Sequence, residues 1–191
     1  LSKRFNDKVR VLNQDILTVN ENIFQRDCVV IGNLPYNIST KILTNLIELS
    51  EKISFKSFIF MFQKEVATKI LAKVNSKNYG RLSIISNWKF SIKKIMDLSP
   101  LCFRPSPKVL STVISFNPKS KYLNIQSKNI KKISKIFFGH RRKKIRKPFL
   151  ELFQNDEKIS KKLNIDLNLR PQNISVETYM LLIKEFEDLS K

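Results

Sequence analysis

Apolar residues along the chain follow two spacings, and each spacing predicts a different kind of element. Short apolar runs rich in β-branched and aromatic residues are typical of strands. Such runs lie at residues 9–12, 27–32, 57–62, 92–98 and 111–116. Apolar residues three and four positions apart are typical of one face of a helix. Stretches of this second kind begin near residues 39, 63, 81, 127 and 175.

The order of these elements predicts an α/β fold. As far as residue 98 the order is strand, strand, helix, strand, helix, helix, strand, which predicts a largely parallel sheet covered by helices. The strand at 111–116 is expected as an antiparallel edge, and every later element is expected to be helical. The polar segment 117–121 marks a linker. It divides the chain into a domain at 1–119 and a small all-α domain at 120–191.

Serine, threonine and proline at helix ends refine this prediction. Ser39 or Thr40, Ser127 and Ser175 stand where a hydroxyl can cap the first turn of a helix. Pro148 follows a run of basic residues and should end or kink any helix formed by that run.

The polar loop Asn33-Leu34-Pro35-Tyr36 follows the apolar run at 27–32. In open α/β sheets, ligands bind at the carboxyl ends of the strands. The side-chain oxygen of Asn33 and a main-chain carbonyl near Pro35 can accept the two N–H groups of a nucleobase amine, while Tyr36 can stack on the base. A simple turn is the competing interpretation, because asparagine, proline and tyrosine are common in turns.

Two other segments carry candidate residues of the same site. Residues 99–107 contain three prolines, which predict a stiff, extended loop that presents Phe103. Asp15 follows the run at 9–12, where a carboxylate can accept a hydrogen bond from a base amine or a ribose hydroxyl. Capping of a following turn is an equally good interpretation of Asp15.

The charge balance points to a polyanionic partner. The chain has 36 lysines and arginines against 16 aspartates and glutamates, a net charge of +20. No acidic residue lies between Leu98 and Leu150, where the basic run 140–147 is interleaved with aromatic residues. This pattern favours nucleic-acid binding over a merely solvated surface. His140, the single histidine, is expected to face phosphate or to be a bystander.

Other classes of function are disfavoured. No apolar run approaches the roughly 20 residues needed to span a bilayer, and residues 1–4 do not resemble a signal peptide. Cys28 and Cys102 are too few and too far apart for a metal site or a disulfide framework. We therefore expect a cytoplasmic protein without membrane association or metal.

Five ordered motifs resemble the small-subunit rRNA adenine N6,N6-dimethyltransferases, over nearly the whole chain from residue 9 to residue 189. They are VIGNLPYNIST at 30–40, QKEVA at 63–67, NYGRLS at 78–83, Phe103-x-Pro-x-Pro-Lys-Val with Ser111, and Arg141-Arg142-Lys143-x-x-Arg146. Asn-Leu-Pro-Tyr alone is less specific, because many amino-methyltransferases carry a related motif.

The resemblance implies a Rossmann-like methyltransferase sheet and a defined reaction. Such enzymes transfer methyl groups from S-adenosylmethionine to N6 of two adjacent adenosines near the 3′ end of small-subunit rRNA. Asn33 and Pro35 would hold the amine, Tyr36 and Phe103 would sandwich the flipped base, and Asp15 and Asn33 would contact the cofactor. The RNA-binding residues would be Lys108, Arg141, Arg142, Lys143 and Arg146. The implied partner is the 30S pre-ribosomal particle, bound by a monomer.

The sequence departs from the family at its start. The family begins with strands and a glycine-rich loop that bind the cofactor, whereas this chain has three glycines and none upstream of Asp15. The 191 residues alone are therefore expected to bind S-adenosylmethionine poorly and to be inactive.

Three alternatives remain open at this point. The first is a large-subunit rRNA adenine methyltransferase of the macrolide-resistance type, which the basic motif at 141–146 disfavours. The second is a DNA adenine methyltransferase, disfavoured because such enzymes carry Asp/Asn-Pro-Pro and a larger sequence-reading domain. The third is a non-catalytic RNA-binding or ribosome-assembly factor.

Overall fold

A computed structural model describes residues 9–154 and 157–190. Its sheet contains β1 (Cys28–Asn33), β2 (Phe55–Gln63), β3 (Phe90–Leu98) and β4 (Ser111–Pro118). The helices of the first half are α2 (Ser39–Leu49), α3 (Lys64–Ile70) and α4 (Arg81–Asn87). Those of the second half are α5 (Ser127–Phe138), α6 (Arg146–Leu152), α7 (Lys158–Lys162) and α8 (Val176–Leu189). Short 3-10 turns lie at Glu21–Ile23, Pro100–Cys102 and Pro171–Asn173.

The strand order in the sheet is β1-β2-β4-β3. β1 and β2 are parallel, and β4 is antiparallel to both of its neighbours, β2 and β3. β1, β2 and β3 therefore run in one direction, as the largely parallel prediction requires. The prediction of β4 as an edge strand is wrong, because β4 is inserted between β2 and β3 and leaves β3 at the edge.

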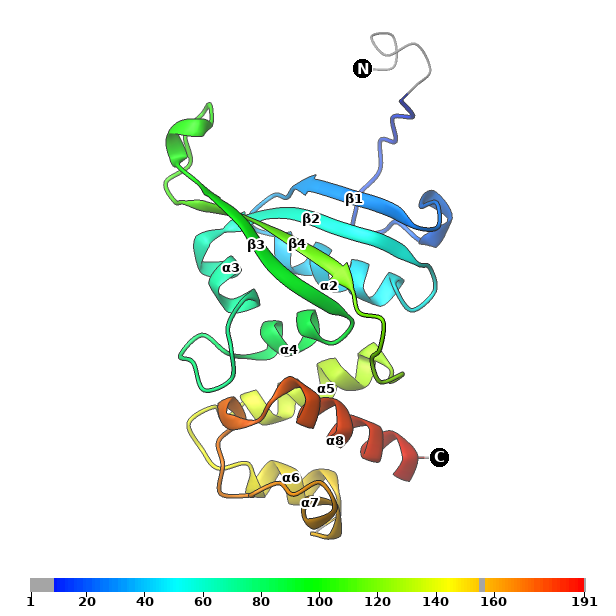
Figure 1. Cartoon of the computed structure of the whole chain (residues 1–191), viewed down its shortest axis with the longest axis vertical. Coiled ribbons are helices and arrows are strands. Elements are labelled where there is room, and N and C mark those ends of the chain that lie inside the picture. Colours follow the sequence, from blue (N-terminus) through cyan, green and yellow to red (C-terminus); the bar gives the residue numbers. More distant parts are fainter. Residues whose placement is uncertain (1–8, 155–156, 191) are drawn as a thin grey trace.

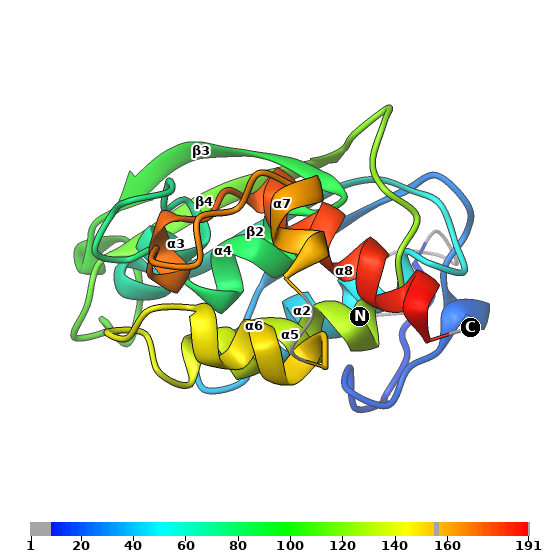
Figure 2. The same cartoon turned by 90° about the horizontal axis from the view of Figure 1, so that it is seen from below.

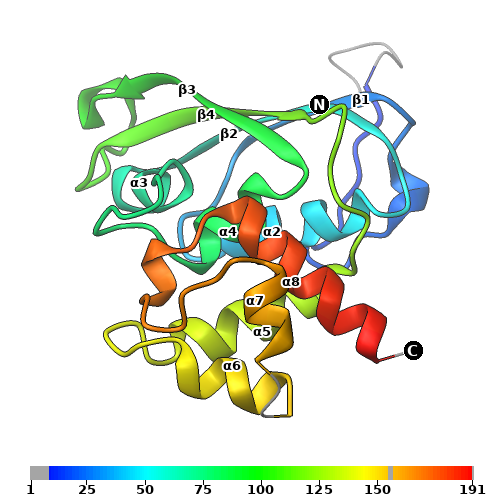
Figure 3. The same cartoon turned by 60° about the horizontal axis from the view of Figure 1, so that its bottom comes forward.

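The molecule is layered (Figures 1 and 3). Helices α2, α3 and α4 cover one face of the sheet, and the helices of the second half lie beyond them. Seen from that end, α5, α6, α7 and α8 lie in front of α4 (Figure 2). This arrangement bears out the prediction of a Rossmann-like sheet followed by helices.

A row of phenylalanines fixes the sheet to its helices. Phe58, Phe60 and Phe62 alternate along β2, so that all three point to the same face, and each is almost fully buried. They contact Phe90 of β3 and Phe116 of β4 at ring-centroid distances of 4.9–6.2 Å. Alternation with period 2 thus produces a single aromatic layer on one face of the sheet.

The second half packs on the first through the same core. Buried apolar residues of the sheet layer and of the later helices form one continuous cluster. The phenol of buried Tyr79, just before α4, donates a 2.9 Å hydrogen bond to the carbonyl of Ile174, just before α8. The connection between β4 and α5 contains the predicted domain boundary near residue 119, and the division into two domains stays a prediction.

The predicted strand at 9–12 is wrong. Val9, Val11 and Leu12 are 40–49% exposed and belong to no strand. A strand needs a neighbour to take its backbone N–H and C=O groups. Within the residues described, β1 pairs with β2 alone and leaves its other edge free.

Three predictions about helix ends are also wrong, and one is confirmed. α2 and α5 have no side-chain cap of their own, because Ile38 and Gln126 occupy the N-cap positions. Pro148 breaks no helix: α6 starts at Arg146, so Pro148 lies in the first turn, where its missing N–H has no partner to lose. Ser175 does cap α8, since its Oγ accepts from the Thr178 N–H at 3.1 Å.

No helix within residues 9–154 and 157–190 is long and apolar enough to cross a membrane. The same described residues contain no group of three or more potential metal ligands.

Candidate functional site

A cleft of about 320 Å³ lies at the carboxyl end of β1. One wall is the loop that follows β1, and the other is the proline-rich loop between β3 and β4. The lining residues are Asn33, Leu34, Pro35, Tyr36, Met61, Phe103, Pro105 and Pro107. The structure therefore brings together the four residues predicted as catalytic, Asn33, Pro35, Tyr36 and Phe103, from segments 67 or more positions apart.

Gly32 allows the chain to turn at the end of β1. A Cβ atom at this position would lie 2.7 Å from the Cδ2 of Leu34 and 3.3 Å from the ring of Phe60. Leu34 is consequently buried against the strand, while the preceding Asn33 keeps an exposed carboxamide at the mouth of the cleft. Asn33 pairs in register with Met61 of β2, which explains why Met61 lines the same cleft.

The main-chain carbonyls of this loop are not equivalent. The Pro35 carbonyl accepts from the Ile38 N–H at 3.1 Å, and the Tyr36 carbonyl accepts from the Ser39 Oγ at 3.1 Å. These bonds start α2 in place of a side-chain cap. The Leu34 carbonyl accepts no hydrogen bond from the described part of the chain, so it is the available main-chain acceptor beside Asn33.

The Tyr36 ring is held at its far end. Its hydroxyl lies 2.7 Å from the hydroxyl of Ser111, the first residue of β4. Tyr36 is half-buried and Ser111 is fully buried. The hydrogen bond therefore joins the loop after β1 to the start of β4.

The loop that carries Phe103 is ordered by its own hydrogen bonds. The Ser99 Oγ accepts from the Leu101 N–H at 3.3 Å, and the Phe103 N–H donates to the Pro100 carbonyl at 3.2 Å. The Ser106 Oγ donates to the same Pro100 carbonyl at 2.8 Å. The predicted stiff loop is present, and it includes a short 3-10 turn at Pro100–Cys102.

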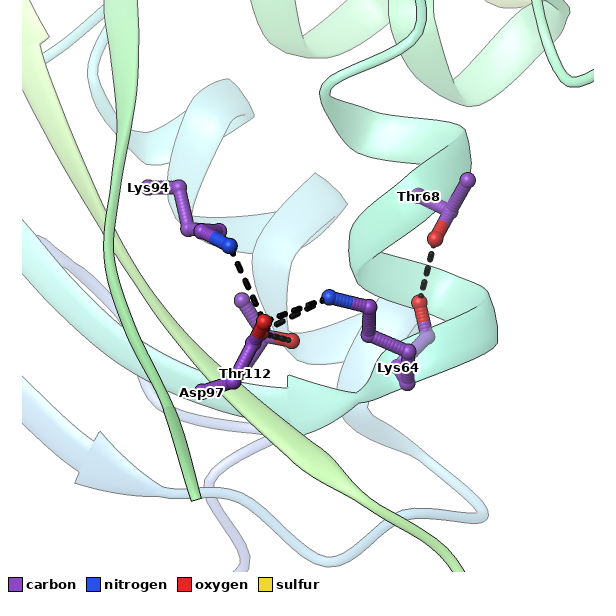
Figure 4. A network of polar contacts seen from close by, with 5 residues as sticks. All are labelled: Lys64, Thr68, Lys94, Asp97 and Thr112. Carbon is purple, nitrogen blue, oxygen red and sulfur yellow. Dashed lines mark hydrogen bonds and ion pairs between the residues drawn. The ribbon is translucent and has the colours of Figure 1, made fainter.

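An ion-pair network lies where this loop leaves β3 and enters β4 (Figure 4). The Asp97 carboxylate accepts from the Nζ of Lys64 at 2.7 Å, the Nζ of Lys94 at 2.9 Å and the Oγ1 of Thr112 at 2.7 Å. The hydrogen bonds from Lys64, Thr112 and Lys94, in that order of size, hold the pKa of Asp97 well below its usual range. β3, β4 and the start of α3 are joined at one carboxylate.

Comparison with known proteins identifies the family. A family model described as ribosomal RNA adenine dimethylase matches residues 1–188. The chain belongs to this family. A curated relative from Pelagibacter ubique (strain HTCC1062), named ribosomal RNA small subunit methyltransferase A, is 45% identical over 192 residues, which cover 99% of this chain and 73% of the relative. The protein of the same name from Ehrlichia canis (strain Jake) is 38% identical, over 92% of this chain and 67% of that relative.

Solved structures agree on the fold. A dimethyladenosine transferase from Plasmodium falciparum superposes with a TM-score of 0.81 at 23% identity, covering 99% of this chain and 78% of the other. The 23S rRNA methyltransferase ErmE superposes with a TM-score of 0.65 at 17% identity, covering 97% and 76%. This member of the adenine dimethylase family therefore has the Rossmann-like α/β fold of methyltransferases.

In this adenine dimethylase, Asp15 has a local role. Its Oδ1 accepts from the Leu17 N–H at 2.9 Å, and its main-chain carbonyl accepts from the N–H and the Oγ1 of Thr18. The turn interpretation of Asp15 is thus correct. Its second carboxylate oxygen accepts no hydrogen bond from the residues that the structure describes, so contact with a cofactor stays a prediction.

The predicted RNA-binding residues separate into two groups. The Arg141 guanidinium is engaged internally, with the Gln172 Oε1 at 3.1 Å and the carbonyls of Ser76 and Lys77. Arg142, Lys143 and Arg146 instead line an open groove of about 960 Å³. Lys108 is exposed near the end of the Phe103 loop, and His140 is exposed as well.

The sequence missed several residues of these sites. The groove is also lined by Lys144, Lys147, Leu150, Glu151, Asn168 and Arg170. Lys144 and Lys147 belong to the same basic run as Arg142, so composition was an adequate signal for them. Arg170 comes from a segment before α8, and no local pattern marks it. Met61 and Ser111 depend on strand register, which the sequence does not reveal.

Proposed function

We propose that the chain acts in the S-adenosylmethionine-dependent dimethylation of N6 of two adjacent adenosines near the 3′ end of small-subunit rRNA. Membership of the adenine dimethylase family supports the reaction type. The names of the two curated relatives support the small-subunit target. ErmE shares the fold at 17% identity, which carries no argument for its 23S substrate.

The cleft is the observation that carries this proposal. Its lining residues supply two neighbouring oxygen acceptors, the Asn33 carboxamide and the Leu34 carbonyl, and two aromatic rings, those of Tyr36 and Phe103. An exocyclic amine has two N–H groups and an adjoining aromatic ring. The acceptors would fix the two N–H groups, and the two side-chain rings would stack on the base. Stacking on each aromatic ring contributes about 1–3 kcal/mol.

These residues activate the amine by orienting it. The lone pair of an adenine N6 is delocalised into the ring, which makes the nitrogen a poor nucleophile. Hydrogen bonds to Asn33 and Leu34 hold both N–H groups and direct the remaining lone pair out of the base plane. Positioning of this kind lowers a barrier by removing the entropy of alignment. The base must leave its stack to reach the cleft, as in other enzymes that act on a nucleobase.

No general base is needed within the cleft. Tyr36 is the only titratable side chain among its lining residues, and its hydroxyl is occupied by Ser111. The proton of the methylated amine would pass to water after the transfer.

The chain fits one side of a nucleoside-type methyl donor. Asn33 ends β1 with an exposed carboxamide, and Asp15 keeps one carboxylate oxygen available to an amine. When bound, S-adenosylmethionine supplies an electrophilic methyl group. Asn33 and Asp15 are the residues of this chain that would hold it.

The basic groove is the proposed rRNA-binding surface. Six of its nine lining residues are lysine or arginine and one is acidic. Such a surface binds phosphates and is sensitive to salt. We assign the 30S pre-ribosomal particle as the partner, which places the reaction in the cytoplasm.

Methyl transfer to ribosomal particles tests the proposal. A protein that carries this chain together with the glycine-rich segment of the family is incubated with S-adenosylmethionine and 30S particles that lack the two dimethyladenosines, and the RNA is digested and examined by mass spectrometry for N6,N6-dimethyladenosine. We expect the product in 30S rRNA and none in protein-free 23S rRNA. Binding of 30S particles without any methylated product would instead support an assembly factor.

A further inference from the structure

Three consecutive residues where the Phe103 loop enters β4 are bound to three different elements. The Leu110 carbonyl accepts from the Lys64 N–H at 2.9 Å, at the start of α3. The Ser111 hydroxyl bonds to the Tyr36 hydroxyl at 2.7 Å, in the loop after β1. The Thr112 hydroxyl donates to the Asp97 carboxylate at 2.7 Å, on β3.

The middle residue joins the two walls of the cleft. Ser111 is the first residue of β4 and pairs in register with Gln63 of β2 on one side and Leu98 of β3 on the other. The loop that carries Phe103 ends directly before it. Tyr36, on the opposite wall, reaches Ser111 through its hydroxyl. Ser111 thus directly follows the loop that carries Phe103 and is hydrogen-bonded to Tyr36 of the other loop.

We propose that Ser111 is a positioning residue for the target base, holding the Tyr36 ring at a fixed place opposite Phe103. The inference rests on the proposed function, in which a base lies between these rings. Ser111 does not line the cleft and has no contact with the base. It acts through Tyr36.

The surroundings of Ser111 make it a fixed support. The residue has 0% exposure, and in the described part of the chain its hydroxyl has Tyr36 as its side-chain hydrogen-bond partner. A buried hydroxyl without a partner is costly, so the pair is favoured over separate groups. On either side, Lys64 binds both the Leu110 carbonyl and Asp97, and Asp97 binds Thr112 (Figure 4). Ser111 therefore lies between two residues that are each bound to another element.

A double-mutant cycle in the full-length protein that carries this chain tests this role. Ser111→Ala and Tyr36→Phe each remove one hydroxyl of the same bond. Each should lower the single-turnover rate of methyl transfer about three- to tenfold, the range expected for one hydrogen bond. The double variant Ser111→Ala/Tyr36→Phe should be no slower than either single variant, because both changes remove one interaction. The dissociation constant for RNA should stay within about twofold.

Matched variants separate positioning from folding. Ser111→Thr keeps the hydroxyl and should recover the rate. Ser115→Ala removes a hydroxyl from the same strand, one bonded to the Lys93 carbonyl at 3.4 Å, and should leave the rate unchanged. Losses that multiply in the double variant, or an unchanged rate in Ser111→Ala, would overturn the proposal. So would an equal loss of rate in Ser115→Ala.

A second measurement needs no methyl transfer. The chain has four tyrosines, so labelled tyrosine allows the Tyr36 ring to be followed by NMR. Its ring flips should be faster in Ser111→Ala than in the wild type and unchanged in Ser115→Ala. Equal flip rates in all three would overturn the positioning role. A wild type with the slow ring flip and no methyl transfer would overturn the proposed function alone.

Discussion

The Glu51 carboxylate caps the first turn of α5 by accepting two hydrogen bonds from Ser127, one from its N–H at 2.8 Å and one from its hydroxyl at 3.0 Å. Glu51 follows α2 in the sheet half of the molecule, whereas Ser127 begins the helical half. A second carboxylate, that of Glu187 in α8, accepts from the Gln126 N–H at 2.7 Å. Acidic groups at a helix start also interact favourably with the helix dipole.

We expect Glu51→Ala to lower the free energy of unfolding by about 1–2 kcal/mol, the usual effect of losing a helix cap. For a chain of this size, that corresponds to a decrease in Tm of about 2–8 °C. Thermal unfolding measures the effect. Glu65→Ala is the matched control, because within residues 9–154 and 157–190 its carboxylate pairs with Lys69 alone, on the surface of α3. Equal Tm values for the two variants would contradict the capping role.

In the full-length protein, Asn33→Ala should abolish methyl transfer and leave RNA binding intact. Loss of one preorganised hydrogen-bonding group at a reacting centre costs about 10²–10³ in rate. The single-turnover rate and the dissociation constant for 30S particles are measured on the same preparation. Asn37→Ala, an exposed asparagine at the other end of the same loop, is the control and should keep its rate. Loss of both activities in Asn33→Ala would indicate a structural role.

Arg142→Ala should affect RNA binding, whereas Arg141→Ala should affect thermal stability. Arg142 lines the basic groove, so its loss should weaken RNA binding and reduce the slope of log K against log salt by about 1. Arg141 is bonded to Gln172, Ser76 and Lys77, so its loss should mainly lower Tm. Salt titrations of binding and thermal unfolding distinguish the two. A full reduction in salt slope for Arg141→Ala would restore it to the RNA-binding surface.

Low pH should weaken the contacts of the Asp97 carboxylate, which join β3 and β4 at the two ends of the Phe103 loop. The pKa of Asp97 is lower in the folded chain than in the unfolded chain because Lys64, Thr112 and Lys94 bind its carboxylate. Its contribution to stability is therefore fully present above the unfolded value of about 3.9 and is lost as the pH falls below it. Urea unfolding between pH 5 and pH 2 should show a steeper loss for the wild type than for Asp97→Asn. Parallel curves would refute the coupling.

The sequence was informative where a property depends on neighbours along the chain. The mostly apolar, aromatic-rich run at 57–62 located β2, and the prolines in 99–107 predicted the loop around Phe103. Spacing three and four favoured a helix at 81–90, and α4 is found at Arg81–Asn87. In each case the local pattern and the tertiary environment require the same conformation.

The errors arise where a property depends on residues far away. Ser127 was expected to cap its own helix, but Glu51 reaches it from 76 positions away and makes a side-chain cap unnecessary. Arg141 stands in a basic run, and the carbonyls of a distant turn bind its guanidinium, which no local pattern reveals; its contact with RNA stays a prediction. The position of β4 depends on which strands it joins, and a strand of eight residues does not encode its own neighbours.

The insertion of β4 between β2 and β3 also affects the order in which the protein folds. Tyr36 is made 75 residues before Ser111, and loops this long close slowly because their closure costs entropy before any contact forms. Under the proposed function, a chain in which β4 has not yet joined the sheet lacks the hydrogen bond that holds the Tyr36 ring beside the target base. We therefore expect the sheet to be complete before a base is captured.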